Sequence, residues 1–133
     1  MGKFREILSS IMHIGLSEEV KKVIENEIQI LSYARFIHEK AIILMSDLTD
    51  KESTKGKRSN GNIETIIINS NRIIMISLDN LKKLNAEKTH LTRALKEAIE
   101  ARRLLKIIIE KHSENQILKK NLEEMNLLII ELT

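Results

Sequence analysis

The stretch IETIIINSNRIIMISLDNLKKLNAEKTHLTRALKEAIEARRLLKIIIEK, residues 63–111, decides the fold class. Its apolar residues recur at steps of three and four, which is the period of a helix face and not the alternation of a strand. The run from Ile66 to Ile68 is β-branched, but the helical period continues through it and no partner strand is visible. We therefore expect one long helix over residues 63–111.

Composition points the same way. The chain has 133 residues, the length of one domain, and its 42% hydrophobic and 31% charged content is typical of a soluble globular chain. Aromatic residues make up only 2%, and proline is absent. Because β-sandwiches and barrels need frequent turn residues and favour aromatic residues, the composition predicts an all-α fold.

Two helices are expected before this stretch. Residues 2–14 have apolar residues at helical spacing and predict a short amphipathic helix that ends at Gly15, a suitable C′ residue. Ser17 is a candidate N-cap for a second helix over residues 17–48. Glu27 is the one misfit in its predicted core stripe, which consists of Val20, Val23, Ile30, Ala34, Ile37, Ala41, Leu44 and Leu48.

Two features complete the layout. Residues 49–62 contain no apolar residue and predict a mobile polar loop. Ser113 and Gln116 have the spacing of a capping box and predict a C-terminal helix over residues 114–132, although a break near His112 is left open. The prediction is a single domain, an antiparallel helical hairpin or three-helix bundle with a long central helix and a short N-terminal helix.

Several classes of function are excluded or disfavoured. The absence of cysteine excludes disulfides, thiolate metal sites and thiol catalysis, and makes a cytoplasmic location the expectation. No segment reaches the ~18 apolar residues typical of a membrane span. The basic residues Lys51, Lys55, Lys57 and Arg58 have acidic neighbours and no aromatic platforms, so we expect no nucleic-acid binding.

The only candidate residues for catalysis or metal binding are histidines and their acidic neighbours. His38 precedes Glu39, as in a phosphoacceptor helix, but Ala41 and Ile42 replace the Arg and Pro of that motif. Glu87 and His90 have the Glu-x-x-His spacing of di-iron bundles, but a dinuclear site needs a second such pair. We expect no catalytic residue, cofactor or metal, and therefore no enzyme.

Three segments carry a resemblance to a known family. They are VIENEIQILSYARFIHEKAIILMSDLTD (23–50), IETIIINSNRIIMISLDNLKKLNAEKTHLTRAL (63–95) and ENQILKKNLEEMNLLIIELT (114–133). In layout and loose pattern, the chain resembles the FlgN-type flagellar export chaperones, small cytosolic helical proteins that hold filament-junction subunits before secretion. The chain departs from the family in its Ile-rich, aromatic-poor core and its additional N-terminal helix.

The resemblance implies that the C-terminal helix binds the client, at Asn115, Leu118, Leu122, Met125 and Ile129. The residues add a second reason, because this helix is apolar over a wider face than packing on one neighbour requires. Ile117, Leu128 and Ile130 lie beside the stripe and are expected to stay partly open to an amphipathic helix of a partner.

Two readings of function remain open. The first is a non-enzymatic helical chaperone or adaptor that binds an amphipathic helix of a client, of which a flagellar export substrate is one form. The second is a structural dimerisation or signalling coiled coil, which would make the protein a homodimer. A phosphotransfer role for His38 is a distant third.

Overall fold

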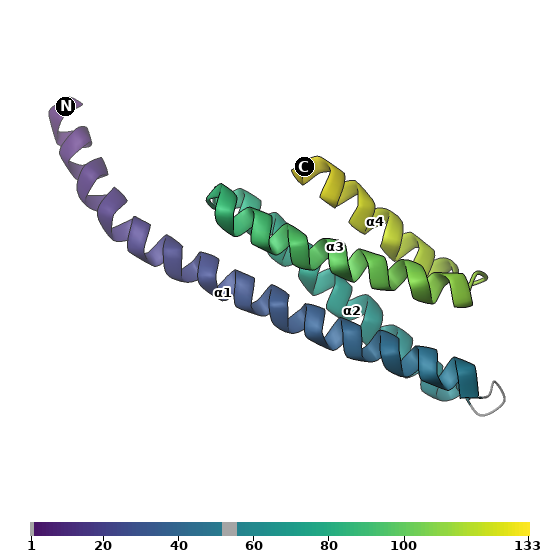
Figure 1. Ribbon diagram of the computed structural model, residues 1–133. Coiled ribbons are helices and arrows are strands. Elements are labelled where there is room, and N and C mark those ends of the chain that lie inside the picture. The colour runs from purple at the N-terminus through teal and green to yellow at the C-terminus, as the bar shows by residue number, and fades with distance from the viewer. Residues whose placement is uncertain (1, 52–55) are drawn as a thin grey trace.

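The computed structural model describes the backbone of residues 2–51 and 56–133, and the side chains of residues 18–49 and 61–133. All regular structure in these ranges is helical, which confirms the predicted all-α fold. The helices run alternately in opposite directions (Figure 1). They are α1 (Gly2–Lys51), α2 (Gly56–Lys83), α3 (Lys88–Lys111) and α4 (Gln116–Leu132).

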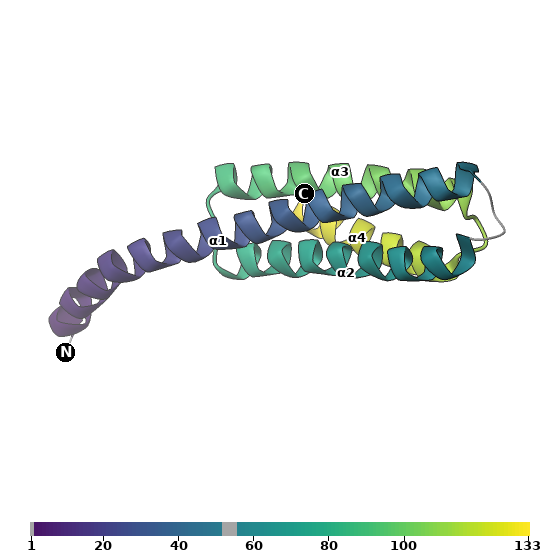
Figure 2. The ribbon, with the colours of Figure 1, turned by 90° about the horizontal axis from the view of Figure 1, so that it is seen from below.

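The helices pack around α2 and α3. The backbone of α1 lies close to both of them, as does that of α4, whereas the backbones of α1 and α4 do not approach each other within the described part of the chain. The N-terminal end of α1 extends beyond the ends of α2 and α3 (Figure 1 and Figure 2). Within the described part of the chain, the side of α1 that is turned away from α2 and α3 has no neighbouring helix.

The predicted helix over residues 63–111 is wrong in one respect, because it is two helices joined by a turn. Asn85 has φ 53°, in the left-handed region, and the N–H of Ala86 donates to the carbonyl of Leu81 at 3.1 Å. Asn enters this conformation more readily than most residues and can replace Gly at a helix end. The turn reverses the chain, so α3 packs beside α2 and does not extend it.

The predicted break at Gly15 and the N-cap at Ser17 are also wrong, because α1 is one helix from Gly2 to Lys51. A glycine inside a helix costs only about 0.5–1 kcal/mol, which a long helix can offset. The predicted loop over residues 49–62 is shorter too, since α1 continues to Lys51 and α2 begins at Gly56. Residues 52–55 of that loop lie outside the described part.

The break near His112 that the sequence left open is present. Helix α3 ends at Lys111, and α4 begins after Asn115, whose side chain accepts a hydrogen bond from the N–H of Leu118 at 3.0 Å. Asn115 is therefore the N-cap, and the predicted capping box at Ser113 is wrong. Asn, like Ser, satisfies one of the free N–H groups of the first helical turn.

The core consists of two apolar clusters, one toward each end of the bundle. The first contains Ile24, Ile28, Leu31, Ala34, Ile74, Leu78, Leu81, Ala94, Ala98, Ala101, Met125 and Ile129. The second contains Ala41, Ile42, Met45, Ile63, Ile67, Leu105, Ile108 and Leu118.

A buried polar layer separates the two clusters. On α1 His38 lies between Ala34 and Ala41, on α2 Ser70 and Asn71 lie between Ile67 and Ile74, and on α4 Asn121 lies between Leu118 and Met125. The amide of Asn71 donates to Oδ1 of Asn121 at 2.7 Å. In a core made largely of Ile and Leu, a directional bond of this kind favours one register of the helices over its neighbours.

Candidate protein-binding surface

Most of the predicted client residues on α4 belong to the core. Leu118, Met125 and Ile129 are buried in the two apolar clusters, and Leu122 and Leu128 pack against them half-buried. These side chains cover α2 and α3. The predicted residues therefore do form one apolar side of α4, but this side packs against α2 and α3 and is not open to a client.

Asn115 has a structural task as well. Besides capping α4, its amide donates to the carboxylate of Glu64 on α2 at 2.9 Å. Both halves of its side chain are therefore used within the chain. This double role explains why an Asn stands at the start of α4 without reference to a client.

Two of the predicted α4 residues, Ile117 and Ile130, are open to solvent, together with Leu127. They share the outer face of α4 with Lys120, Glu123, Glu124 and Glu131, all but Lys120 acidic. Isolated aliphatic residues among charges are normal on a protein surface. The predicted binding role of these residues stays a prediction.

The outer face of α1 is different. The row Val23, Ile30, Ile37 and Leu44 is 41–51% exposed, at intervals of seven residues that place all four on one side of the helix. Tyr33, Phe36 and Ile43 are exposed nearby. Lys40 is the only charged residue among the exposed residues from Asn26 to Leu44, and its ammonium lies 5.3 Å from the centre of the Phe36 ring.

Helix α2 extends this apolar surface. The amide of Asn80 donates to Oε1 of Glu27 at 3.3 Å, which fixes the level at which the antiparallel helices meet. Because the two helices are antiparallel, residues with higher numbers than Glu27 on α1 lie beside residues with lower numbers than Asn80 on α2. Ile73 therefore lies beside the stretch between Ile30 and Ile37, and Ile66 lies beside the next turn toward Leu44. Both are exposed, at 43% and 45%.

We call these six residues, Val23, Ile30, Ile37, Leu44, Ile66 and Ile73, the outer row. The α1 members of the outer row belong to the core stripe predicted from the sequence, and this prediction is wrong because they are 41–51% exposed. The buried side of α1 is formed by Ile24, Ile28, Leu31, Ala34, His38, Ala41, Ile42 and Met45. Helix α1 is therefore apolar on two sides, of which its own chain covers one.

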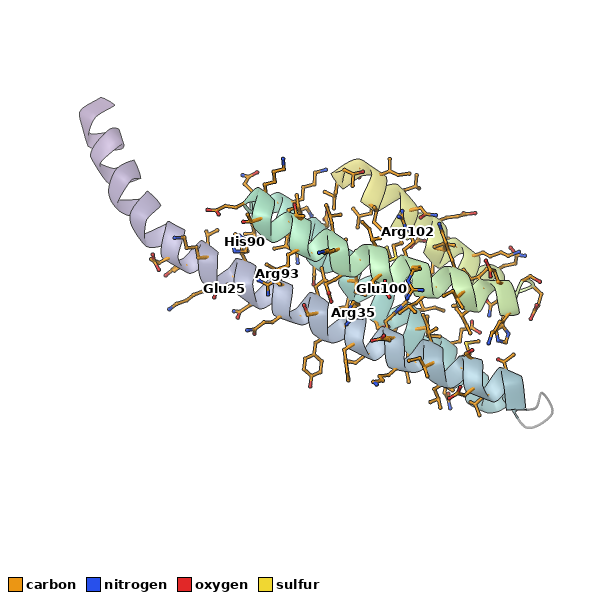
Figure 3. All side chains as sticks on the ribbon, in the orientation of Figure 1. Glu25, Arg35, His90, Arg93, Glu100 and Arg102 are labelled. Carbon is orange, nitrogen blue, oxygen red and sulfur yellow. The ribbon has the colours of Figure 1, made fainter. Side chains whose placement is uncertain are left out.

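The seam between α1 and α3 is polar at its rim. Arg35 donates from Nε to Glu97 at 2.5 Å and also contacts Glu39 at 3.3 Å. Further along, Lys111 bonds to Ser46, and Thr49 Oγ1 lies 2.8 Å from His112 Nε2. Figure 3 shows Arg35 on α1 and Arg93 and Glu100 on α3 along this seam.

An open depression lies on the same side of the molecule, near the start of α3. Gln29, Ser32, Tyr33 and Phe36 of α1 line it together with Arg93 of α3. His90 and Glu25 lie close to it, where α3 passes over α1 (Figure 3). In the described part of the chain, no group of three or more His, Asp or Glu residues is arranged to hold a metal ion.

The candidate phosphoacceptor His38 lies in the core and not at the surface. His38 is fully buried, and neither ring nitrogen has a hydrogen-bond partner. Burial, and secondarily the charge of Arg35, lowers the pKa of His38 from 6.5 to about 4, so its ring is neutral at pH 7. A phosphoryl donor has no access to His38 in this conformation. Glu87, the partner suggested for His90, is the N-cap residue of α3.

Comparison of the chain with family models, with characterised proteins and with solved structures gives no match in any of the three. The resemblance to FlgN-type chaperones therefore stays a hypothesis. In the described part of the chain, no helix has both the length and the apolarity to cross a bilayer.

The outer row had a signal in the sequence, namely the strict seven-residue interval of Val23, Ile30, Ile37 and Leu44. The buried side has less regular spacing and includes His38, so its pattern is weaker in the sequence. The sequence of α1 contains both apolar stripes.

Proposed function

We propose that the protein is a non-enzymatic helical adaptor that binds an amphipathic helix of a partner protein along the outer row. The observation that carries the proposal is the exposure of this row on a face that is almost free of charge. Soluble proteins seldom expose a contiguous apolar surface of this extent unless it binds something. Helices that dock on such a surface present apolar residues at three-, four- and seven-residue intervals.

The outer row supports helix binding better than binding of a small molecule. Its members lie along the seam of two antiparallel helices and form an elongated strip, which matches the shape of one helix face. Full burial of a Leu or Ile side chain contributes roughly 1.5–3 kcal/mol, and the outer-row residues, which are 41–51% exposed, would gain about half of that each. A few such contacts suffice for a complex of useful affinity, even after the cost of association is subtracted.

A flagellar export chaperone is one form of this proposal, and the resemblance in layout is its support. The surface proposed here differs from the one that the resemblance implies. It lies on α1 and α2, whereas the implied client residues on α4 are largely committed to the core.

Site-specific photo-crosslinking in the source cells tests the proposal. A photoreactive residue at Tyr33, which is 72% exposed beside the outer row, should give a discrete crosslinked product with a different protein. The same residue at Lys96, exposed on α3, is the matched control and should not. Mass spectrometry of the product should locate the crosslink on an amphipathic helix of the partner.

The complex should then depend on the outer row. Replacing Ile37 with Glu should abolish the Tyr33 crosslink and weaken binding of the purified partner by on the order of 10-fold or more. Replacing Ile99 with Glu on α3, where the side chain is 42% exposed, should change neither. A crosslink of equal yield from Tyr33 and Lys96, or one that survives the Ile37 substitution, would contradict the proposal.

A further inference from the structure

The outer row is the surface on which the proposed function rests, and its extent suggests what covers it when no client is bound. The six residues of the row and the adjoining Tyr33 are large side chains about half open to solvent. At about half of the ~150–250 Å² of an aromatic side chain, and somewhat less for each aliphatic one, they present roughly 600 Å². A stable protein interface needs about 800 Å² from each partner, so the row would form the apolar centre of such an interface and the polar residues around it would form the rim.

We infer that a second copy of this chain covers the outer row in the absence of a client, with the two α1 helices packed antiparallel. The row is self-complementary in this arrangement, because its α1 members are evenly spaced about a centre near Tyr33. A two-fold axis at that point places Val23 against Leu44 of the second copy, and Ile30 against Ile37 of the second copy. Such a contact is isologous and closes at two copies.

Charge favours the antiparallel direction through Asp47, whereas the other end of the row has two exposed acids and two exposed bases, Glu18, Glu19, Lys21 and Lys22, which balance. Lys22 precedes the row and Asp47 follows it, and both are exposed. The antiparallel pair brings Lys22 of each copy within about two residues, roughly 3 Å along the axis, of Asp47 of the other. A parallel pair would align lysine with lysine and aspartate with aspartate. Among the exposed residues from Asn26 to Leu44, only Lys40 is charged, and its ammonium lies 5.3 Å from the centre of its own Phe36 ring.

Dimerisation would therefore regulate the proposed function. The second copy and a client helix use the same residues, so they compete, and a client binds only by separating the two copies. The dimer keeps an apolar surface out of water until a client with a better-matched helix arrives.

The first test is the mass of the full chain in solution between 1 and 100 μM, by sedimentation velocity and light scattering. We expect a dimer in this range. Replacing Ile30 and Ile37 together with Glu places like charges opposite each other and should raise the dissociation constant by on the order of 100-fold or more. The matched double replacement of Ile99 and Ile107 on α3 should leave the dimer intact. Helicity by circular dichroism should be retained in both variants.

The second test uses the absence of cysteine in the chain. Val23 and Leu44 lie 21 residues apart on α1, about 30 Å along the helix. In an antiparallel dimer, the single variants Val23→Cys and Leu44→Cys should each form little disulfide alone and a heterodisulfide when mixed under mild oxidation. In a parallel dimer each single variant would crosslink with itself, and the antiparallel assignment would be wrong.

The outcomes separate this inference from the proposed function. A chain that is monomeric at 100 μM, or a dimer that survives the Ile30 and Ile37 replacements, overturns the inference. A monomer that still gives a heterologous crosslink at Tyr33 leaves the proposed function standing. A dimer that no cellular protein displaces supports the inference and overturns the client proposal.

Discussion

Helix α1 makes two seams, and their rims differ. The seam with α3 is edged by three polar pairs, Arg35 with Glu97, Ser46 with Lys111, and Thr49 with His112, which are exposed or partly buried. The seam with α2 is edged by the outer row, and among the side chains that the structure describes its one hydrogen-bonded pair across the two helices is Glu27 with Asn80. Both seams close over the same apolar core.

The difference indicates which side of α1 would gain free energy from a further partner. A rim of hydrogen-bonded polar groups can remain in water without cost, whereas a rim of exposed Ile and Leu gains free energy when it is covered. The outer face of α3 agrees with this reading, because Lys88, Arg93, Lys96, Arg103, Lys106, Glu110 and Lys111 dominate its exposed positions. The α1–α3 side faces solvent, and the α1–α2 side is where a further chain is expected.

The largest expected effect on the free energy of unfolding concerns α4, where a core residue and a surface residue are neighbours in the sequence. Leu118 is fully buried and Ile117 is 59% exposed. Leu118→Ala should lower the free energy of unfolding by about 2–5 kcal/mol, because it removes apolar contacts and leaves a cavity. Ile117→Ala should change it by less than about 0.5 kcal/mol.

Urea denaturation followed by circular dichroism measures both variants. Similar losses for the two would mean that the outer face of α4 is also packed. The contrast drawn between the α1–α2 rim and the other helices would then fail, because α4 would have a covered outer face as well.

The sequence was sufficient for the helical class because the three- and four-residue period is a local property. It was not sufficient for the turn at Asn85, since nothing but a single Asn marks a reversal that Gly or Pro usually marks. Gly15 gave the opposite error, a break signal inside a helix that continues. In both places the outcome depends on packing between helices, which no local pattern reports.

The candidate binding surface could be predicted from the sequence only in part, for the same reason. The amphipathic pattern identified α4 as a packing helix, but the pattern cannot say whether the chain itself or a partner covers it. On α1, two apolar sides compete, and Val23 and Ile37 look as suitable for a core as Leu31 does. The choice follows from where α2 and α3 lie. His38 was also unpredictable as a buried group, since histidine is common at surfaces.

The second prediction concerns the buried side of α1, which carries His38. Its pKa falls from 6.5 in the unfolded chain to about 4 in the fold, so between these pH values only the unfolded chain binds the proton. The stabilising effect is present above pH 6.5 and is lost as the pH falls toward 4. The loss should reach on the order of 3 kcal/mol.

Denaturant titrations at pH 7, 5.5 and 4 measure this slope. Carboxylates titrate in the same range, so the test is the difference between the wild type and His38→Leu, which lacks the ring. Equal slopes in the wild type and His38→Leu would show that the ring reaches water in the folded chain and that this side of α1 is open too.

The third prediction concerns the Asn pair that joins α2 to α4. Asn121→Ala removes the acceptor for the Asn71 amide, and Asn71 Oδ1 already has no partner. A buried amide left fully unpaired should lower the free energy of unfolding by about 1–3 kcal/mol. Replacing both residues with Leu should recover most of this loss, because apolar side chains leave no unpaired group.

A double-mutant cycle on Asn71 and Asn121 measures the coupling. An additive result would mean that the two amides do not interact, and that the register of α4 is set elsewhere. The outer row is on the far side of α2 from this pair, so the assembly state in solution should not change in these variants.

The smallest expected effect on the free energy of unfolding concerns the two rims of α1. Glu97→Gln removes one carboxylate from Arg35, which keeps Glu39, and both partners of the lost pair are partly exposed, at 22% and 33% of their side chains. The free energy of unfolding should fall by about 0.2–1 kcal/mol, and by less at high salt, as for other solvent-accessible ion pairs.

Ile37→Gln is the matched change on the other rim. It should lower the free energy of unfolding by no more than Glu97→Gln does, when both variants are unfolded at a concentration where the chain is monomeric. Its effect should show only in association. If Ile37→Gln destabilises the monomer more than Glu97→Gln does, Ile37 is packed by its own chain. The α1–α2 seam would then be as complete as the α1–α3 seam.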